Sequence, residues 1–249
     1  GAANLRNAFP GKTKKELGSV ERKFYHHLCD LFIETLKLTH MSKVQIMKRA
    51  RLTDPVLLDR LFSEDRDVAL VVGHYGNWEW MNILPFWTKH RIVSIYKPLK
   101  EKHFDKYMIR TRSKFGSVPA PMSNVGRVII ENRKKNIRAL YGLLTDQTPP
   151  KNDIKYWTNF LNQDTPVFLG AEKIAIKYDM AVVFLNIQKI KRGYYKVIPE
   201  LLFEHSAGLP DHLITQTHVK KLEQTIIEKP EYWLWSHRRW KHKRENSDG

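Results

Sequence analysis

His74 and Glu79 are the two side chains whose types and spacing are best suited to chemistry in this sequence. A carboxylate beside an imidazole fixes the tautomer of the ring and stabilises its protonated form, and the pair can then act as a general base. If both residues lay on one helix, they would be about 140° apart around its axis. Only a histidine that precedes the helix can therefore reach the glutamate.

The residues around this pair predict elements that would place it in this way. Val68 to Val72 is a continuous apolar run rich in β-branched residues, which is typical of a buried strand. Gly73 and Gly76 indicate a turn, and the bulky apolar residues that follow indicate a short helix ending near Pro85. The backbone N–H groups at the start of that helix, beside the histidine, suit a developing oxyanion.

The segment His74-Tyr-Gly-Asn-Trp-Glu79 resembles the His-x4-Asp/Glu motif of glycerolipid-type acyltransferases, in the form found in the late acyltransferases of lipid A biosynthesis. In that family the histidine removes the proton from an acceptor hydroxyl, which then attacks an acyl thioester. The resemblance implies that His74 is the base and that Glu79 orients it. The spacing alone leaves another interpretation open, in which the histidine is a hydrogen-bonded residue at a strand end and the glutamate is solvated.

Further segments extend the resemblance over residues 4–241. The ending Pro230-Glu-Tyr-Trp-Leu-Trp-Ser-His-Arg-Arg-Trp-Lys241 resembles the terminus of the family almost position by position. Asp146-Gln147 resembles its Asp-Gln loop, and the stretch after Tyr96 resembles the region whose cations are thought to hold phosphates. The substrate-binding residues that we expect are Asn77, Lys97, Arg110, Arg112, Asp146, Gln147, Arg238 and Arg239, with Trp78, Trp80, Phe86, Trp87 and Phe168 along an acyl slot.

Position supports some of these residues more than others. Lys97 and Asp146 each follow a predicted strand, and loops at the carboxyl edge of a sheet line its crevice. Taken singly, Arg110 and Arg112 could equally be solvated cations on a helix, and Asp146 could be a simple turn residue. The aromatic side chains could equally belong to the core.

Strand patterns alternating with helix patterns predict an α/β fold, a single domain with a mostly parallel sheet flanked by helices. We expect a helical cover over residues 1–66, a catalytic core over 67–241 and a polar tail over 242–249. No apolar run approaches the length of about 20 residues that spans a bilayer. Because residues 4–10 resemble the stretch that follows the membrane anchor of the family, we expect a truncated chain without its N-terminal anchor.

The formal charge of +17 over 249 residues points to acidic partners. A basic nucleic-acid-binding module is the competing class, although no known recognition motif is present and we expect no nucleic acid. The single cysteine, Cys29, excludes an internal disulfide and fits a reducing compartment. The scattered histidines lack metal-ligand spacing, so a zinc site is not expected.

The resemblance implies an O-acyltransferase at the cytoplasmic face of a bacterial inner membrane. The donor would be an acyl-carrier protein or acyl-coenzyme A, the acceptor a lipid A precursor, and no metal or organic cofactor would be needed. Acylation of a lysophospholipid or another membrane lipid is the alternative within the enzymes. We expect Lys241, Lys243 and Arg244 to contact the anionic membrane surface, whereas Trp233 and Trp235 could lie at that surface or in the core.

Overall fold

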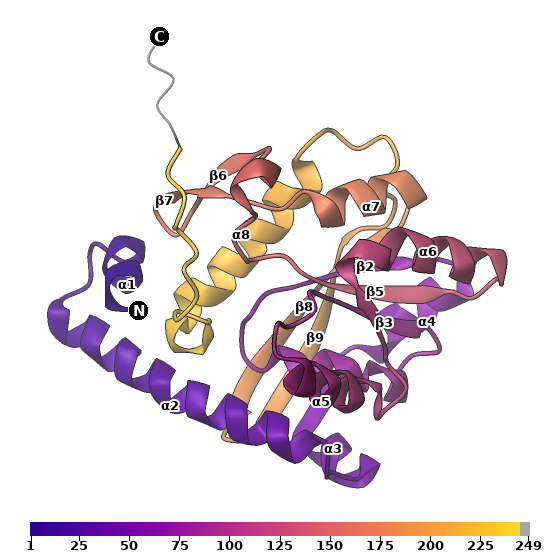
Figure 1. Ribbon diagram of the computed structural model, residues 1–249, viewed down its shortest axis with the longest axis horizontal. Helices are drawn as coiled ribbons and strands as arrows, with labels where there is room; N and C mark the ends of the chain where they lie inside the picture. The colour runs from indigo at the N-terminus through magenta and orange to yellow at the C-terminus, as the bar shows by residue number, and fades with distance from the viewer. Residues whose placement is uncertain (245–249) are drawn as a thin grey trace.

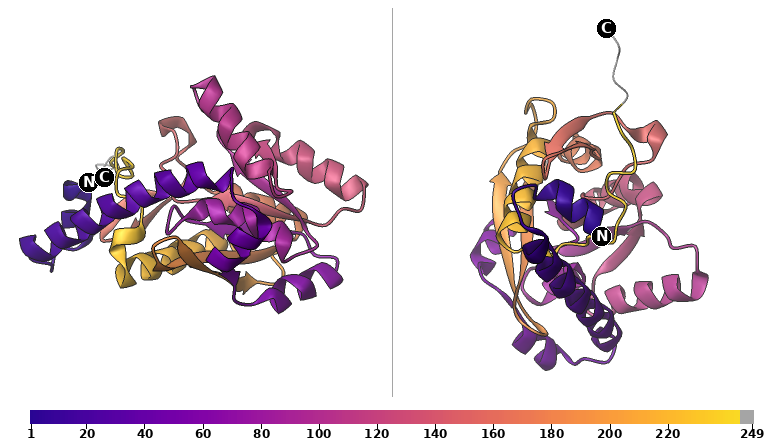
Figure 2. Two further views of the ribbon diagram at one scale, coloured as in Figure 1. Left: turned by 90° about the horizontal axis from the view of Figure 1, so that it is seen from below. Right: turned by 90° about the vertical axis from the view of Figure 1, so that its left-hand side faces the viewer.

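The computed structural model describes residues 1–244, and in it a seven-stranded sheet carries helices on both faces (Figures 1 and 2). The strand order is β1-β9-β8-β2-β5-β3-β4, and within it only the β8–β9 pair is antiparallel. The predicted α/β fold with a mostly parallel sheet is therefore confirmed. The strands are β1 (Ala50–Leu52), β2 (Val68–Val72), β3 (Arg91–Tyr96), β4 (Val118–Pro121), β5 (Ala139–Leu144), β8 (Ala181–Lys191) and β9 (Tyr194–Phe203), with a separate hairpin of β6 (Trp157–Phe160) and β7 (Gln163–Pro166).

The helices divide between the faces and one end of the sheet. Side chains from α6, α7 and α8 belong to the core on one face, and side chains from α3, α4 and the 3-10 helix η1 belong to the core on the other. The long helix α2 runs along one side of the molecule (Figure 1). The helices are α1 (Ala2–Ala8), α2 (Lys14–Leu38), α3 (Lys43–Arg49), α4 (Pro55–Ser63), η1 (Trp78–Phe86), α5 (Lys102–Ser113), η2 (Met122–Asn124), α6 (Val125–Lys134), η3 (Lys151–Asp153), α7 (Gly170–Tyr178), α8 (Leu213–Glu228) and η4 (Pro230–Tyr232).

Strand β2 lies at the centre of the sheet, between β5 and β8. Its side chains alternate, so Ala69 and Val71 enter one core while Val68, Leu70 and Val72 enter the other. Because helices cover both faces, all five residues are buried, and the strand reads as an unbroken apolar run. The strand predicted over these residues is confirmed.

Several boundaries differ from the expectation for physical reasons. Residues 1–66 are not purely helical, because residues 50–52 form β1, which pairs in parallel with β9 at the sheet edge. The segment after the central strand is a 3-10 helix rather than an α-helix, and it contains Pro85, which removes one backbone donor. Residues 157–166, for which no strand was predicted, form the β6–β7 hairpin. Of the predicted tail 242–249, residues 245–249 lie outside the described part of the chain.

Among the residues that the structure describes, no helix combines the length and the hydropathy needed to cross a lipid bilayer.

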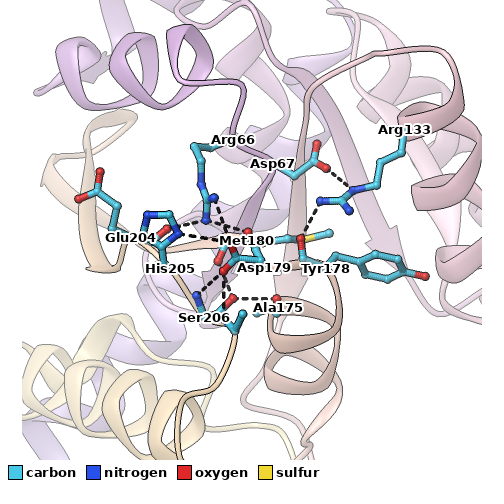
Figure 3. Close-up of polar contacts among 11 residues, drawn as sticks. Arg66, Asp67, Arg133, Ala175, Tyr178, Asp179, Met180, Glu204, His205 and Ser206 are labelled. Atoms are coloured by element: carbon cyan, nitrogen blue, oxygen red, sulfur yellow. Dashed lines mark hydrogen bonds and ion pairs between the residues drawn. The ribbon is translucent and has the colours of Figure 1, made fainter.

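A dense polar cluster lies at the amino edge of β8 (Figure 3). Asp179 ends α7 in the left-handed conformation and accepts hydrogen bonds from the backbone of Ser206 and Ala207 at 2.9 and 3.0 Å. Arg66 pairs with the same carboxylate at 3.1 Å. These bonds hold three chain segments together, and the backbone N–H groups and Arg66 keep the pKa of Asp179 well below its usual value. The cluster holds the amino edge of the sheet together. The candidate site described below lies at the opposite, carboxyl edge.

Candidate active site

The pairing of β2 with β5 brings His74 and Asp146 together. The two strands are parallel and in register, with Val72 opposite Leu144, and the two side chains each follow that pair by two residues. A hydrogen bond from the backbone N–H of Thr145 to the carbonyl of Val72, at 3.1 Å, continues the ladder past the strand ends. Both loops therefore leave the carboxyl edge of the sheet side by side, where ligands bind in open α/β sheets.

Asp146 is the carboxylate that holds His74. Its Oδ1 lies 2.6 Å from Nδ1 of the imidazole, and its Oδ2 accepts the backbone N–H of the same histidine at 2.9 Å. The indole N–H of Trp233 donates a third bond to Oδ2 at 2.8 Å. Both acidic and imidazole side chains are buried, so water competes little with these bonds.

The ionisation of Asp146 fixes the tautomer of the histidine. Burial by itself raises the pKa of the carboxyl, but the charge and hydrogen bonds of His74 and the bond from Trp233 outweigh burial and lower the pKa to about 2. An ionised carboxylate only accepts hydrogen bonds, so Nδ1 carries the proton in the neutral ring. The lone pair is then on Nε2, which lies 3.2 Å from the side-chain nitrogen of Gln147. Nε2 is thus the atom that can accept a proton from a substrate.

The loop of residues 73–77 is held in place by glycine geometry and by α2. Gly76 has a φ of +60°, and a Cβ there would lie 1.9 Å from the carbonyl oxygen of Ile187. The ring of His27 bonds the carbonyl of Gly76 at 3.0 Å, and Asn77 donates to Glu34 at 2.8 Å. The loop therefore has one conformation, fixed from two sides.

Glu79 does not orient His74, and this corrects the expectation from sequence. Its two carboxylate oxygens accept bonds from Arg112 at 2.7 and 3.0 Å, and Asn82 donates to one of them at 3.1 Å. Burial lowers the pKa of Arg112, but the charge and bonds of Glu79 more than offset that effect and raise it. The turn into η1 takes Glu79 toward α5, whereas the neighbouring strand supplies the acid that meets the histidine.

The other expected substrate contacts fall into three groups. Asp146 and Gln147 touch the imidazole, as described above. Asn77 is buried and holds the loop, because its side-chain oxygen caps η1 through the N–H of Glu79 at 3.2 Å while its nitrogen bonds Glu34. Lys97, Arg110 and Arg238 are exposed, and Arg239 is only 1% exposed, so a substrate reaches the first three more easily than the last.

The aromatic residues divide in a similar way. Trp78 packs its ring edge-on against that of His74, with 4.8 Å between the centroids, whereas Trp80 is a core residue. Trp233 and Trp235 are 2% and 0% exposed, so of the two positions left open by the sequence they occupy the core. A direct bond from Trp233 to Asp146 was not predicted. The only signal for it was the Trp-x-Trp pattern near the chain end, which gives no indication of a partner.

The site opens to the surface as a small depression lined by His74, Asp146, Gln147, Trp233, Leu234 and His237. Burial lowers the pKa of His237, so this side chain is neutral near pH 7. The imidazole of His74, with its lone pair oriented by Asp146, can remove a proton from a hydroxyl group. The arrangement is that of a general base that activates an oxygen nucleophile.

Comparison with known proteins identifies one family. The sequence model of one protein family, described as the bacterial lipid A biosynthesis acyltransferases, matches residues 2–242. That range includes both loops of the site and the terminal segment that carries Trp233. A search among curated proteins gave no match.

Proposed function

Because the chain belongs to the bacterial lipid A biosynthesis acyltransferase family and is therefore an acyltransferase, we propose that His74 is its general base. The acyl group would pass from an acyl-carrier-protein thioester to a hydroxyl group of a lipid A precursor. The observation that carries this proposal is the 2.6 Å contact between Asp146 and Nδ1 of His74, which places the proton-accepting lone pair of the ring on Nε2, beside Gln147.

The proposed reaction proceeds by direct attack. Nε2 of His74 takes the proton of the acceptor hydroxyl as its oxygen bonds to the thioester carbonyl carbon, and Asp146 stabilises the imidazolium that forms. The tetrahedral intermediate then breaks its carbon–sulfur bond, and the imidazolium returns the proton to the departing thiolate. A thioester is already an activated acyl donor, so the proposed reaction uses no cofactor and no acyl-enzyme.

The charge of the molecule supports a carrier protein as the donor. A formal charge of +17 would attract an acidic carrier and speed its encounter with the enzyme. Lys97, after β3, and Arg110, on α5, are exposed cations that could meet the phosphate groups of the acceptor or of the carrier. Arg112 is less available for this role, because its guanidinium already forms two bonds with Glu79.

The outer face of α2 supports contact with an inner-membrane surface. Tyr25, Phe32, Ile33 and Leu36 recur at helical spacing and are 45–62% exposed, although they are large and apolar. Exposed Arg22 and Lys37 flank them, a combination typical of helices that lie in the lipid interface. The opposite face of the same helix bonds the loop that carries His74. We propose that this side of the molecule rests on the anionic cytoplasmic leaflet.

The test is acyl transfer in vitro from an acyl-carrier protein to a purified lipid A precursor, followed by mass spectrometry. We expect the precursor to gain the mass of one acyl chain, and His74→Ala to reduce kcat by about 10²–10⁴-fold with an unchanged fold. A lysophospholipid, assayed in parallel, tests the acceptor. Transfer by His74→Ala at the rate of the parent protein would refute the general-base role.

A further inference from the structure

Arg239 is a buried arginine without an ion pair in the described part of the chain. It is 1% exposed, and its Nε and Nη1 atoms have no hydrogen-bond partner. Removing a guanidinium from water costs several kcal/mol unless another charge compensates for it. A cation held in this way needs a negative charge nearby, and the described structure contains one candidate.

That candidate is Asp146. The two side chains line the same small pocket, next to the depression that His74 lines. The remaining wall is largely apolar, with Phe160, Val219 and Leu222 among its residues. Apolar walls screen charges poorly, so the charge of Asp146 acts on the guanidinium across this pocket without a direct contact.

The resting state of the proposed base explains why such a cation would be needed. Before His74 accepts a proton, its ring is neutral, and Asp146 is then a buried anion whose bonds come only from uncharged groups. The neutral ring no longer supplies the charge that does most to lower the pKa of Asp146, so the carboxylate is then easier to protonate. A protonated Asp146 would no longer orient the ring as an acceptor. A second, permanent positive charge prevents this, because arginine keeps its proton at all relevant pH values.

We propose that Arg239 is a positioning residue, which supplies the buried positive charge that keeps Asp146 ionised while His74 is neutral. This inference rests on the function proposed above for His74. It replaces the expectation that Arg239 binds substrate, because its side chain is closed off from the surface. Burial lowers its pKa to about 10, and the charge of Asp146 opposes that effect, so the guanidinium remains protonated at neutral pH.

The ionisable groups around Asp146 determine how the charge near its carboxylate changes with pH. His74 faces it from the loop after β2, and His218 faces it from α8. His237 and Arg239 face it from the terminal segment. Burial lowers the pKa of His218 to about 4, so near pH 7 this side chain is neutral and adds no charge. Arg239 is therefore the permanent cation of the group.

The test is the titration of the His74 ring, followed by NMR in the intact protein. Removing a nearby cation makes protonation easier, so Arg239→Met and Arg239→Gln should move the midpoint upward by about one pH unit. Arg239→Lys keeps the charge and should restore most of the shift. Arg238→Met removes an exposed charge of the same segment, which water screens, and should leave the midpoint within about 0.3 units.

The acyl-transfer assay separates this inference from the proposed function. In Arg239→Met the acidic limb of the kcat/KM profile should move upward with the His74 midpoint, while KM at high pH stays near that of the parent. A raised KM with an unmoved midpoint would mean that Arg239 binds substrate, and the inference would be wrong. If the parent transfers no acyl group but the midpoint shifts, the proposed function fails and the inference about the charge of Arg239 stands.

If the neutral variants do not fold, the carboxyl ¹³C shift of Asp146 in the parent protein is the deciding measurement. A protonated carboxyl beside a neutral His74 overturns the inference.

Discussion

At the residue scale, Asp146 makes the contact with His74 that was expected of Glu79. Asp146 bonds the ring of His74, whereas Glu79 neutralises Arg112. Both acids are buried, so each makes its contacts in a setting where removing one partner is costly. Replacing Asp146 should therefore affect mainly catalysis, whereas replacing Glu79 should affect mainly stability.

We predict that Asp146→Asn lowers kcat by about 10²–10⁴-fold, because an amide can hold the imidazole in the wrong tautomer. Glu79→Gln should affect kcat much less and stability more, by about 3 kcal/mol, since it leaves Arg112 unpaired and largely buried. Steady-state kinetics and urea unfolding of both variants provide the comparison. A loss of kcat confined to Glu79→Gln, at unchanged stability, would restore Glu79 as the partner of the histidine.

At the element scale, α2 connects the catalytic loop with the surface of the molecule. Its inner face holds the loop through His27 and Glu34, while its outer face carries the exposed apolar side chains described above. An amphipathic helix of this kind binds a membrane in proportion to the apolar area that it buries there. The same helix would then set the distance between the lipid surface and the base.

We predict that Phe32→Ser combined with Leu36→Ser weakens binding to vesicles containing anionic lipid by at least about tenfold. Each of these side chains contributes about 1.5–3 kcal/mol when fully buried in an apolar phase. Val56→Ser is the matched control, because Val56 is a 71% exposed apolar residue on α4. Vesicle sedimentation measures the effect. Equal binding of the double variant and the control would place the membrane contact elsewhere, with the cations Lys241, Lys243 and Arg244 as the next segment to replace.

At the scale of the whole molecule, buried histidines make folding sensitive to mild acid. Burial lowers the pKa of His27 and of His218 to about 4. Between that value and the ordinary pKa of about 6.5, the unfolded chain binds protons that the folded chain does not, so stability falls as the pH drops through this window. Asp146, with its lowered pKa, adds stability at pH values above about 4, and this contribution is lost as the pH falls toward 2.

We predict that His27→Gln flattens the fall in unfolding free energy between pH 6.5 and 4 by up to about 1.4 kcal/mol per pH unit. Glutamine can still donate a hydrogen bond to the carbonyl of Gly76, which limits the loss of native contacts. His26→Gln is the control, because His26 is the exposed neighbour of the buried His27. Urea unfolding at several pH values gives the slopes. The same slope in both variants would show that His27 is not the titrating group.

The overall charge leads to a second prediction at this scale. With a carrier protein as donor, kcat/KM should fall steeply between low and moderate salt, because screening shortens the reach of the +17 charge to about 10 Å at 0.1 M. The same acyl group on an uncharged thioester serves as the control and should show little dependence on salt. If the two donors respond to salt alike, a carrier is not steered by this surface.

The sequence by itself determined the local elements and singled out the histidine that we propose as the base. The apolar run of residues 68–72 must be covered on both faces, which favours a buried strand. It forms the strand that was predicted. His74 was identified from its own type and from its place at a strand end. Each of these inferences depends on residues that are close together along the chain.

Only the tertiary structure decided which carboxylate meets that histidine. Glu79 lies five residues from His74 in the sequence and Asp146 lies 72 away, yet Asp146 is the partner, because β5 pairs with β2 in register. Strand order follows from packing over the whole sheet, and no short-range pattern encodes it. The same reason explains why Trp233 and Arg239, from the end of the chain, were not expected beside Asp146: chain folding, and not spacing, sets the surroundings of a buried charge.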